Sequence, residues 1–240
     1  MFAVAKVILG SRVFSEMDAV ELIGKFKRFT TIKDRKLLDN IVRKELYHYS
    51  EIKHDCENMT ETLWRLITAI DSKQEITVHY YKMDRTFAEK RVQPVSIVFM
   101  EFYFYLIAYY PELYDEPRYF RVDRIKDITG HRKYFALSQI PDFDEGLLRK
   151  RCQFMFYGKL RKIRFSFTGP SVQAILDRLP TAKIIERNFG EFLIEAEVHG
   201  DGIKMFLLSQ GSWVKVVSPS DFVTEIQEEI DKMRHLYENT

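Results

Sequence analysis

The sequence predicts an α+β protein built in three parts. Apolar residues recur at helical spacing as far as about Ser72, and the pattern then changes to the two-residue alternation of strands. The last third has the element order β-α-β-β-α-β followed by a long helix. We therefore expect a helical segment over residues 1–71, a small β-barrel over 72–135, a linker over 136–159, and the βαββαβ module with its terminal helix over 160–240.

The first part is expected to hold amphipathic helices. The N-terminal stretch is apolar but contains Lys6 and lacks a cleavage pattern, so it is interpreted as a helix that packs on protein, not as a signal peptide. Ser15 can cap a helix that runs to Phe29, and a further helix covers Lys33–Tyr47. Thr60 can cap the last helix of this part.

The second part has the composition and spacing of short strands. Close connections between such strands predict a small barrel, because closure removes exposed strand edges. The expected strands are 76–81, 87–93, 95–100, 102–109 and 118–128.

The last third alternates strands with short helices. Gly169-Pro170 predicts the start of a helix with proline in its first turn. Asn188–Gly190 predicts a hairpin between two strands. A short helix over Gly202–Gln210 precedes the final strand, and Pro219 starts the long terminal helix.

Composition excludes several classes of protein. Of 240 residues, 46% are hydrophobic and 30% are charged, which is typical of a globular chain, and the net charge of +2 gives no argument for nucleic acid. No apolar run approaches the roughly 18 residues of a membrane span. Cys56 and Cys152 suggest no disulfide framework and favour a reducing, cytoplasmic location.

One stretch resembles a known family. Its residues are Tyr80, Arg91, Pro94, the run Phe104-Tyr105-Leu106, and RYFRVDRI over 118–125. Their order and spacing resemble the WYL domain, in which a strand tyrosine, an arginine and a proline precede Trp-Tyr-Leu and a closing R-x-F-R-x-D-R-I strand. The family's tryptophan is Phe104 here, which keeps an aromatic wall but loses an indole N–H donor.

The flanking segments are similar to what accompanies WYL domains. Residues 160–237 resemble the C-terminal extension that often follows the domain, with VKVVSPSDF joining a last strand to a long helix. The N-terminal helices resemble the connector between a winged helix-turn-helix and the WYL domain. The helix-turn-helix itself is expected to be absent from this chain, so DNA would be reached only indirectly.

The resemblance implies a function and a fold. It implies an Sm/SH3-like barrel, a ferredoxin-like βαββαβ module, and the ligand-sensing and dimerisation part of a bacterial, cytoplasmic transcriptional regulator with no membrane association. A homodimer is expected, because the connector exposes amphipathic helices and such regulators match two-fold operators. The alternative is a stand-alone Sm-like module that binds RNA or single strands without a role in transcription.

The expected ligand is negatively charged, either a nucleotide or a single-stranded nucleic acid. Arginine binds phosphate bidentately, and aromatic rings offer faces for bases. The predicted ligand-binding residues are Arg91, Arg118 and Arg124 with Tyr80 and Tyr105, followed by Arg121 and His79 as second-rank members.

Strand alternation qualifies this set. It places Arg118 and Arg124 on one face and Arg121 on the other, beside Asp123, so Arg121 is interpreted as the structural member. Tyr105 and Leu106 point to opposite faces, with Leu106 in the core. The alternative for all the arginines is ordinary ion pairing with nearby acids.

Catalytic chemistry is not expected. No phosphate-binding glycine loop or nucleophile motif occurs, and His54-Asp55-Cys56 lacks a second ligand pair at zinc spacing. We therefore expect no catalytic residue, no metal and no cofactor. The basic residues between Arg149 and Arg164 are interpreted as a solvated face, with an anion-facing role as the alternative.

Overall fold

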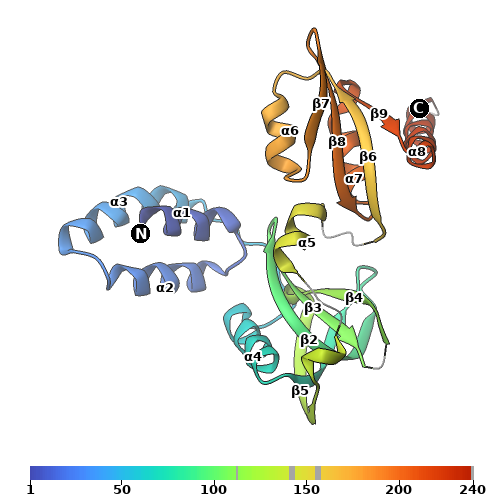
Figure 1. Cartoon of the computed structure of the whole chain (residues 1–240). Helices are drawn as coiled ribbons and strands as arrows, with labels where there is room; N and C mark the ends of the chain where they lie inside the picture. Colours follow the sequence, from blue (N-terminus) through green and yellow to red (C-terminus); the bar gives the residue numbers. More distant parts are fainter. Residues whose placement is uncertain (112, 141–143, 155–157, 239–240) are drawn as a thin grey trace. The chain divides into compact units, whose positions relative to one another are not determined.

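The computed structural model describes residues 1–111, 113–140, 144–154 and 158–238. The chain divides into two compact units, Met1–Phe143 and Asp144–Thr240, each with its own hydrophobic core (Figure 1). The division falls inside the segment predicted as a linker. That segment is not structureless, because it contains the helix α5 (Glu145–Arg151).

Three helices begin the first unit. They are α1 (Phe2–Ser11), α2 (Glu16–Lys27) and α3 (Ile32–Tyr47). The side chain of Ser15 caps α2 as predicted, and Thr31 caps α3 in the same way. The three helices share a small core of their own, whose buried members are Ala5, Leu9, Ala19, Ile23, Leu38 and Val42.

The fourth helix, α4 (Met59–Asp71), begins earlier than predicted. Asn58 is its cap, and the side-chain oxygen of Asn58 accepts a hydrogen bond from the main-chain N–H of Glu61 at 2.9 Å. Thr60 was the expected cap, and it lies within the helix instead. Asparagine is among the best capping residues, so the better-placed Asn58 sets the helix start.

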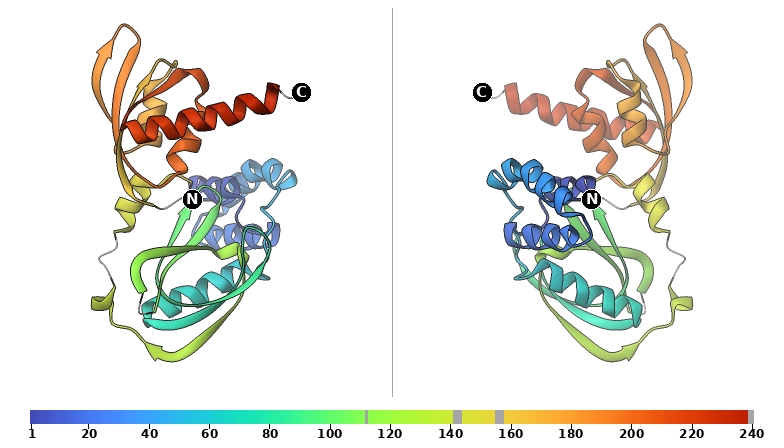
Figure 2. Two further views of the ribbon diagram at one scale, coloured as in Figure 1. Left: turned by 90° about the vertical axis from the view of Figure 1, so that its right-hand side faces the viewer. Right: turned by 90° about the vertical axis from the view of Figure 1, so that its left-hand side faces the viewer.

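A sheet follows α4 in the first unit. Its strands run in the order β4-β3-β2-β1-β5, and every neighbouring pair is antiparallel. Figure 2 shows these strands curling, with α4 packed against β1, β2 and β5. Among the described residues no ladder joins β4 to β5, so the sheet is a curled half-barrel with two edges and not the closed barrel that was expected. The strands are β1 (Gln74–Tyr81), β2 (Phe87–Met100), β3 (Tyr103–Tyr110), β4 (Leu113–Arg121) and β5 (Ile125–Tyr134).

Two strand predictions are corrected. The runs 87–93 and 95–100 form the single strand β2, which has a register shift between Pro94 and Ser96. Proline has no N–H to donate, so the ladder shifts there without ending. The run 118–128 is broken by the 3₁₀ turn η1 (Val122–Arg124), which separates β4 from β5.

The core of the curled sheet lies on the side of α4. Val78, Val92 and Leu106 are fully buried there together with Leu66 of α4. Leu106 is therefore a core residue, as the alternation predicted.

The second unit has the element order that the sequence predicted. Its sheet runs β7-β8-β6-β9, with all pairs antiparallel. One boundary differs: Ser171 caps α6, so Gly169-Pro170 precedes the helix and does not open it. The elements are β6 (Leu160–Phe167), α6 (Val172–Arg178), β7 (Lys183–Asn188), β8 (Glu191–His199), α7 (Gly202–Ser209), β9 (Val214–Ser218) and α8 (Ser220–Glu238).

Within the described ranges, no helix is both long and apolar enough to cross a bilayer.

Candidate functional site

The predicted arginines of β4 lie on opposite faces of the sheet. Arg118 is paired with Ala108, a core residue, whereas Arg121 is paired with Tyr105 on the other side of β3. Partners directly opposite in a ladder share a face. The two arginines are therefore separated by the sheet, as strand alternation predicts.

Arg121 forms a bidentate ion pair with Asp123. Its Nε lies 3.0 Å from Oδ1 and its Nη2 lies 2.7 Å from Oδ2. The guanidinium also lies over the ring of Tyr103, 3.4 Å from the centroid. The side chain of Asp123 is only 4% exposed, so this pair is largely withdrawn from water. Arg121 is therefore paired with Asp123, the acid beside which strand alternation placed it.

Tyr105 is paired with Arg121 across the β3–β4 ladder, and Arg124 follows Asp123 in η1. Burial raises the pKa of Tyr105 to about 12, against the opposing effect of the positive charges of Arg121 and Arg124. Tyr105 is therefore a neutral phenol that can donate a hydrogen bond. Arg124 is half-buried in η1, and it has no ion pair or hydrogen bond to the described part of the chain. Together Tyr103, Tyr105, Arg121, Asp123 and Arg124 make up what we call the η1 cluster.

The grouping of Arg124 differs from the prediction. Simple alternation placed it with Arg118, but η1 interrupts the strand between them, and Arg124 lies close enough to Tyr105 to lower its pKa. Arg118 instead lies over the ring of Tyr110, 5.5 Å from the centroid, and Lys90 lies over the same ring at 5.9 Å. Lys90 and Tyr110 had not been predicted as site residues.

Arg91 is bound to a buried acid. Its Nε contacts Oε1 of Glu75, a residue whose side chain is fully buried, and Nζ of Lys133 lies 3.8 Å from Oε2. The amide of Gln93 lies 3.4 Å from the same Oε2. A buried carboxylate needs such partners. Arg91 therefore neutralises Glu75 and does not lie in the η1 cluster.

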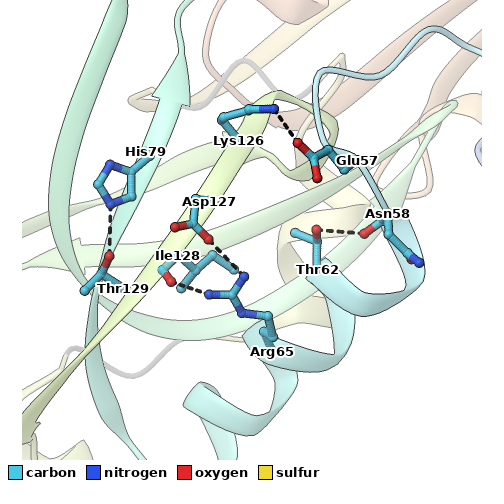
Figure 3. Close-up of polar contacts among 9 residues, drawn as sticks. All are labelled: Glu57, Asn58, Thr62, Arg65, His79, Lys126, Asp127, Ile128 and Thr129. Atoms are coloured by element: carbon cyan, nitrogen blue, oxygen red, sulfur yellow. Dashed lines mark hydrogen bonds and ion pairs between the residues drawn. The ribbon is translucent and has the colours of Figure 1, made fainter.

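The two predicted residues of β1 are also engaged elsewhere. Nε2 of His79 lies 3.0 Å from the hydroxyl of Thr129 on β5, as Figure 3 shows, and Nδ1 lies 3.3 Å from Glu89. The ring of Tyr80 packs edge-on against Phe120, with the centroids 5.4 Å apart, beside the core. Neither residue belongs to the η1 cluster.

A set of contacts joins α4 and the end of the loop before it to the first residues of β5 (Figure 3). Lys126 pairs with Glu57 at 2.7 Å, and Arg65 pairs with Asp127 at 3.0 Å. Arg65 also donates to the main-chain carbonyl of Ile128. Sequence reasoning missed these residues, because they lie some sixty residues apart and no local pattern connects them.

Two further features bear on chemistry. Burial raises the pKa of the Cys56 thiol to about 11, which makes it a poor nucleophile. No group of three residues able to hold a metal ion occurs in the described ranges.

A hollow of about 570 Å³ lies between α2 and α4. Its apolar lining includes Leu22, Leu63, Trp64 and Ile67, and it contains none of the seven predicted ligand-binding residues.

Comparison with known proteins identifies the central segment. Residues 61–129, from within α4 to β5, match the model of the WYL domain. This segment of the chain is therefore a WYL domain. No curated protein matches the chain significantly.

Two solved structures are similar to the chain. Proteasome accessory factor B/C (PafBC) of Arthrobacter aurescens is 18% identical, with a TM-score of 0.35, over 72% of this chain and 26% of that one. A CRISPR Cas-related protein is 16% identical, with a TM-score of 0.48, over 85% of this chain and 59% of that one. The chain thus spans less than two thirds of the length of either.

Proposed function

We propose that the chain is the ligand-sensing and dimerisation part of a bacterial transcriptional regulator. The WYL domain over residues 61–129 supports this class of function. On this proposal the chain contacts DNA only indirectly, through a helix-turn-helix module outside this sequence. The domain binds a negatively charged ligand, either a nucleotide or a single-stranded nucleic acid.

The η1 cluster is the site that supports an anionic ligand best. The observation that carries this choice is Arg124, a half-buried cation with no acidic partner in the described ranges, beside Tyr105 and Arg121. A phosphate that reaches Arg124 also meets a neutral phenol as a donor and a second guanidinium. Arg118, with Lys90, offers a separate cationic surface on the opposite face. Arg91, His79 and Tyr80 support the sheet in this proposal.

Binding of a labelled oligothymidylate at low salt, followed by fluorescence anisotropy, tests the proposal. Arg124→Ala should weaken binding about tenfold or more, because hydrogen bonds to charged groups contribute about 1.5–3 kcal/mol. Affinity should also fall steeply with added salt, since bound phosphates release counterions. ADP as a competitor distinguishes a nucleotide site from a surface for single strands.

Arg43→Ala is the matched control, because Arg43 is an exposed arginine of α3 outside the η1 cluster. Equal weakening by Arg43→Ala and Arg124→Ala would mean that binding follows overall charge and not this site. No binding of either probe at low salt would reject the anionic ligand.

The finer fold, the assembly and the location complete the proposal. The return of β5 to β1 supports an Sm/SH3-like strand order for the curled half-barrel, and the order β7-β8-β6-β9 supports a ferredoxin-like module. The free, buried cysteines favour a reducing cytoplasm. We propose a homodimer that binds its ligand without catalysing a reaction.

A further inference from the structure

Asp123 holds two different parts of the first unit at once. Its carboxylate oxygens accept hydrogen bonds from Nε and Nη2 of Arg121, at 3.0 and 2.7 Å. Its main-chain carbonyl accepts hydrogen bonds from the N–H groups of Asp55 and Cys56, at 2.8 and 3.1 Å. One residue of η1 therefore joins the η1 cluster to the loop between α3 and α4.

That loop is in turn attached to the N-terminal helices. The N–H of Ile52 donates to the carbonyl of Arg12, at the end of α1, at 2.9 Å. Downstream, the side chain of Cys56 is buried in the core of the curled sheet, and Asn58 caps α4. Residues 52–58 therefore connect the α1–α3 layer to η1 and α4 through main-chain hydrogen bonds.

We infer that η1 is a switch by which an anion at the η1 cluster changes how the N-terminal helices are attached; this rests on the proposed function. A phosphate bound bidentately by Nε and Nη2 of Arg121 takes the place of the Asp123 carboxylate. A carboxylate that is 4% exposed is not stable there without a partner. Asp123 must then move toward water.

On this inference the movement of the side chain also moves the main chain. Asp123 is the middle residue of the three-residue turn η1, and its displacement from the buried position shifts the turn and with it the Asp123 carbonyl. The carbonyl then releases the N–H groups of Asp55 and Cys56. The ligand thus favours one of two arrangements of η1. The difference between its binding free energies for the two arrangements determines how far their populations shift.

Amide hydrogen exchange of the full chain, measured by NMR, tests this inference. In the free protein the amides of Asp55 and Cys56 should be protected. Asp123→Asn and Arg121→Gln should each speed their exchange at least about tenfold, as a local opening would. The amide of Phe135, bonded to the Lys73 carbonyl at 3.0 Å, reports whether the fold as a whole is retained.

Lys126→Gln is the matched control. It removes an exposed ion pair to Glu57, in the same loop, without touching η1. Exchange at Asp55 and Cys56 should be unchanged in this variant. If it rises as much as in Asp123→Asn, the loop is simply loose and the switch is wrong.

Adding oligothymidylate to the wild type separates the two proposals. Faster exchange at Asp55 and Cys56 on binding supports the switch. Arg124-dependent binding with unchanged exchange contradicts the switch and leaves the proposed function standing. If oligothymidylate does not bind, the anionic ligand fails, and unchanged exchange in the ligand-free Asp123→Asn protein still rejects the coupling on its own.

Discussion

The guanidinium of Arg91, half exposed on β2, covers the fully buried carboxylate of Glu75 on β1. Lys133 is the second cation near the carboxylate of Glu75. This ion pair leads to the first prediction, that Arg91 stabilises the fold.

Arg91→Ala should lower the free energy of unfolding by about 1–3 kcal/mol, because it leaves a buried charged group without its main partner. Urea denaturation measures the change. Adding Glu75→Gln to the Arg91→Ala protein should restore part of the loss. An Arg91→Ala protein as stable as the wild type would show that Lys133 alone satisfies Glu75.

The two arginines of the η1 cluster should differ in their effect on stability. Arg121→Ala leaves Asp123 buried and unpaired, and should cost about 3–5 kcal/mol. Arg124→Ala removes a half-buried cation without an acidic partner in the described ranges, and should change stability by less than about 0.5 kcal/mol. Thermal melting of both variants measures the difference. Similar melting temperatures would contradict a stabilising role of the Arg121–Asp123 pair in the ligand-free protein.

Tyr105 should make stability fall at high pH. Its pKa is raised to about 12 by burial, above the value of about 10 for an exposed tyrosine. The folded state therefore holds the phenolic proton more tightly than the unfolded state. This contribution is complete below pH of about 10 and is lost as pH rises toward 12. Melting temperatures across this range should fall less steeply in Tyr105→Phe, and identical slopes would contradict the prediction.

Cys56 should resist alkylation in the folded protein. Its pKa is raised to about 11 by burial, so the thiolate is scarce at pH 8, where an exposed thiol with a pKa of about 8.5 reacts readily. Iodoacetamide treatment followed by mass spectrometry should find Cys56 unmodified in native protein and modified in urea. Rapid modification under native conditions would mean that the loop over Cys56 opens freely.

Self-association should involve α3. Leu37 and Ile41 lie one turn apart on this helix, and their side chains are 49% and 40% exposed. Light scattering should give a mass near twice the 28.6 kDa of one chain, and Leu37→Glu with Ile41→Glu should shift it toward one chain. The control is Lys36→Glu on the same helix. A monomeric wild type at high protein concentration would rule out the dimer.

Most of the fold could be predicted from the periodicity of apolar residues in the sequence. The change of pattern near Ser72 separated helices from strands, and the hairpin at Asn188–Gly190 placed β7 and β8 correctly. The turn η1 between β4 and β5 could not be predicted, because residues 118–128 alternate as a single strand would. The amides of residues 55 and 56, which are distant in the sequence, bind the Asp123 carbonyl in this turn, and a local pattern cannot predict that contact.

The candidate site could be predicted from the sequence only in part. The resemblance identified Tyr105, Arg121 and Arg124 as residues of one region, and the three lie close together. It also included Arg91, whose partner Glu75 lies on the neighbouring strand and whose role depends on the burial of that acid. The burial of a single carboxylate depends on the side chains from other strands that cover it. Alternation within one strand does not predict which side chains these are.

The return of β5 to β1 has a consequence for synthesis on the ribosome. Strand β1 begins at Gln74, but its second neighbour starts only at Ile125, so some fifty residues must emerge before that edge is covered. During this interval the nascent chain exposes a β-rich edge, which favours pairing with other chains. The helix α4 is made first and packs on β1 and β2, so it can shield the growing sheet until β5 arrives. Variants that weaken α4 should therefore reduce the yield of soluble protein more than they reduce its stability once folded.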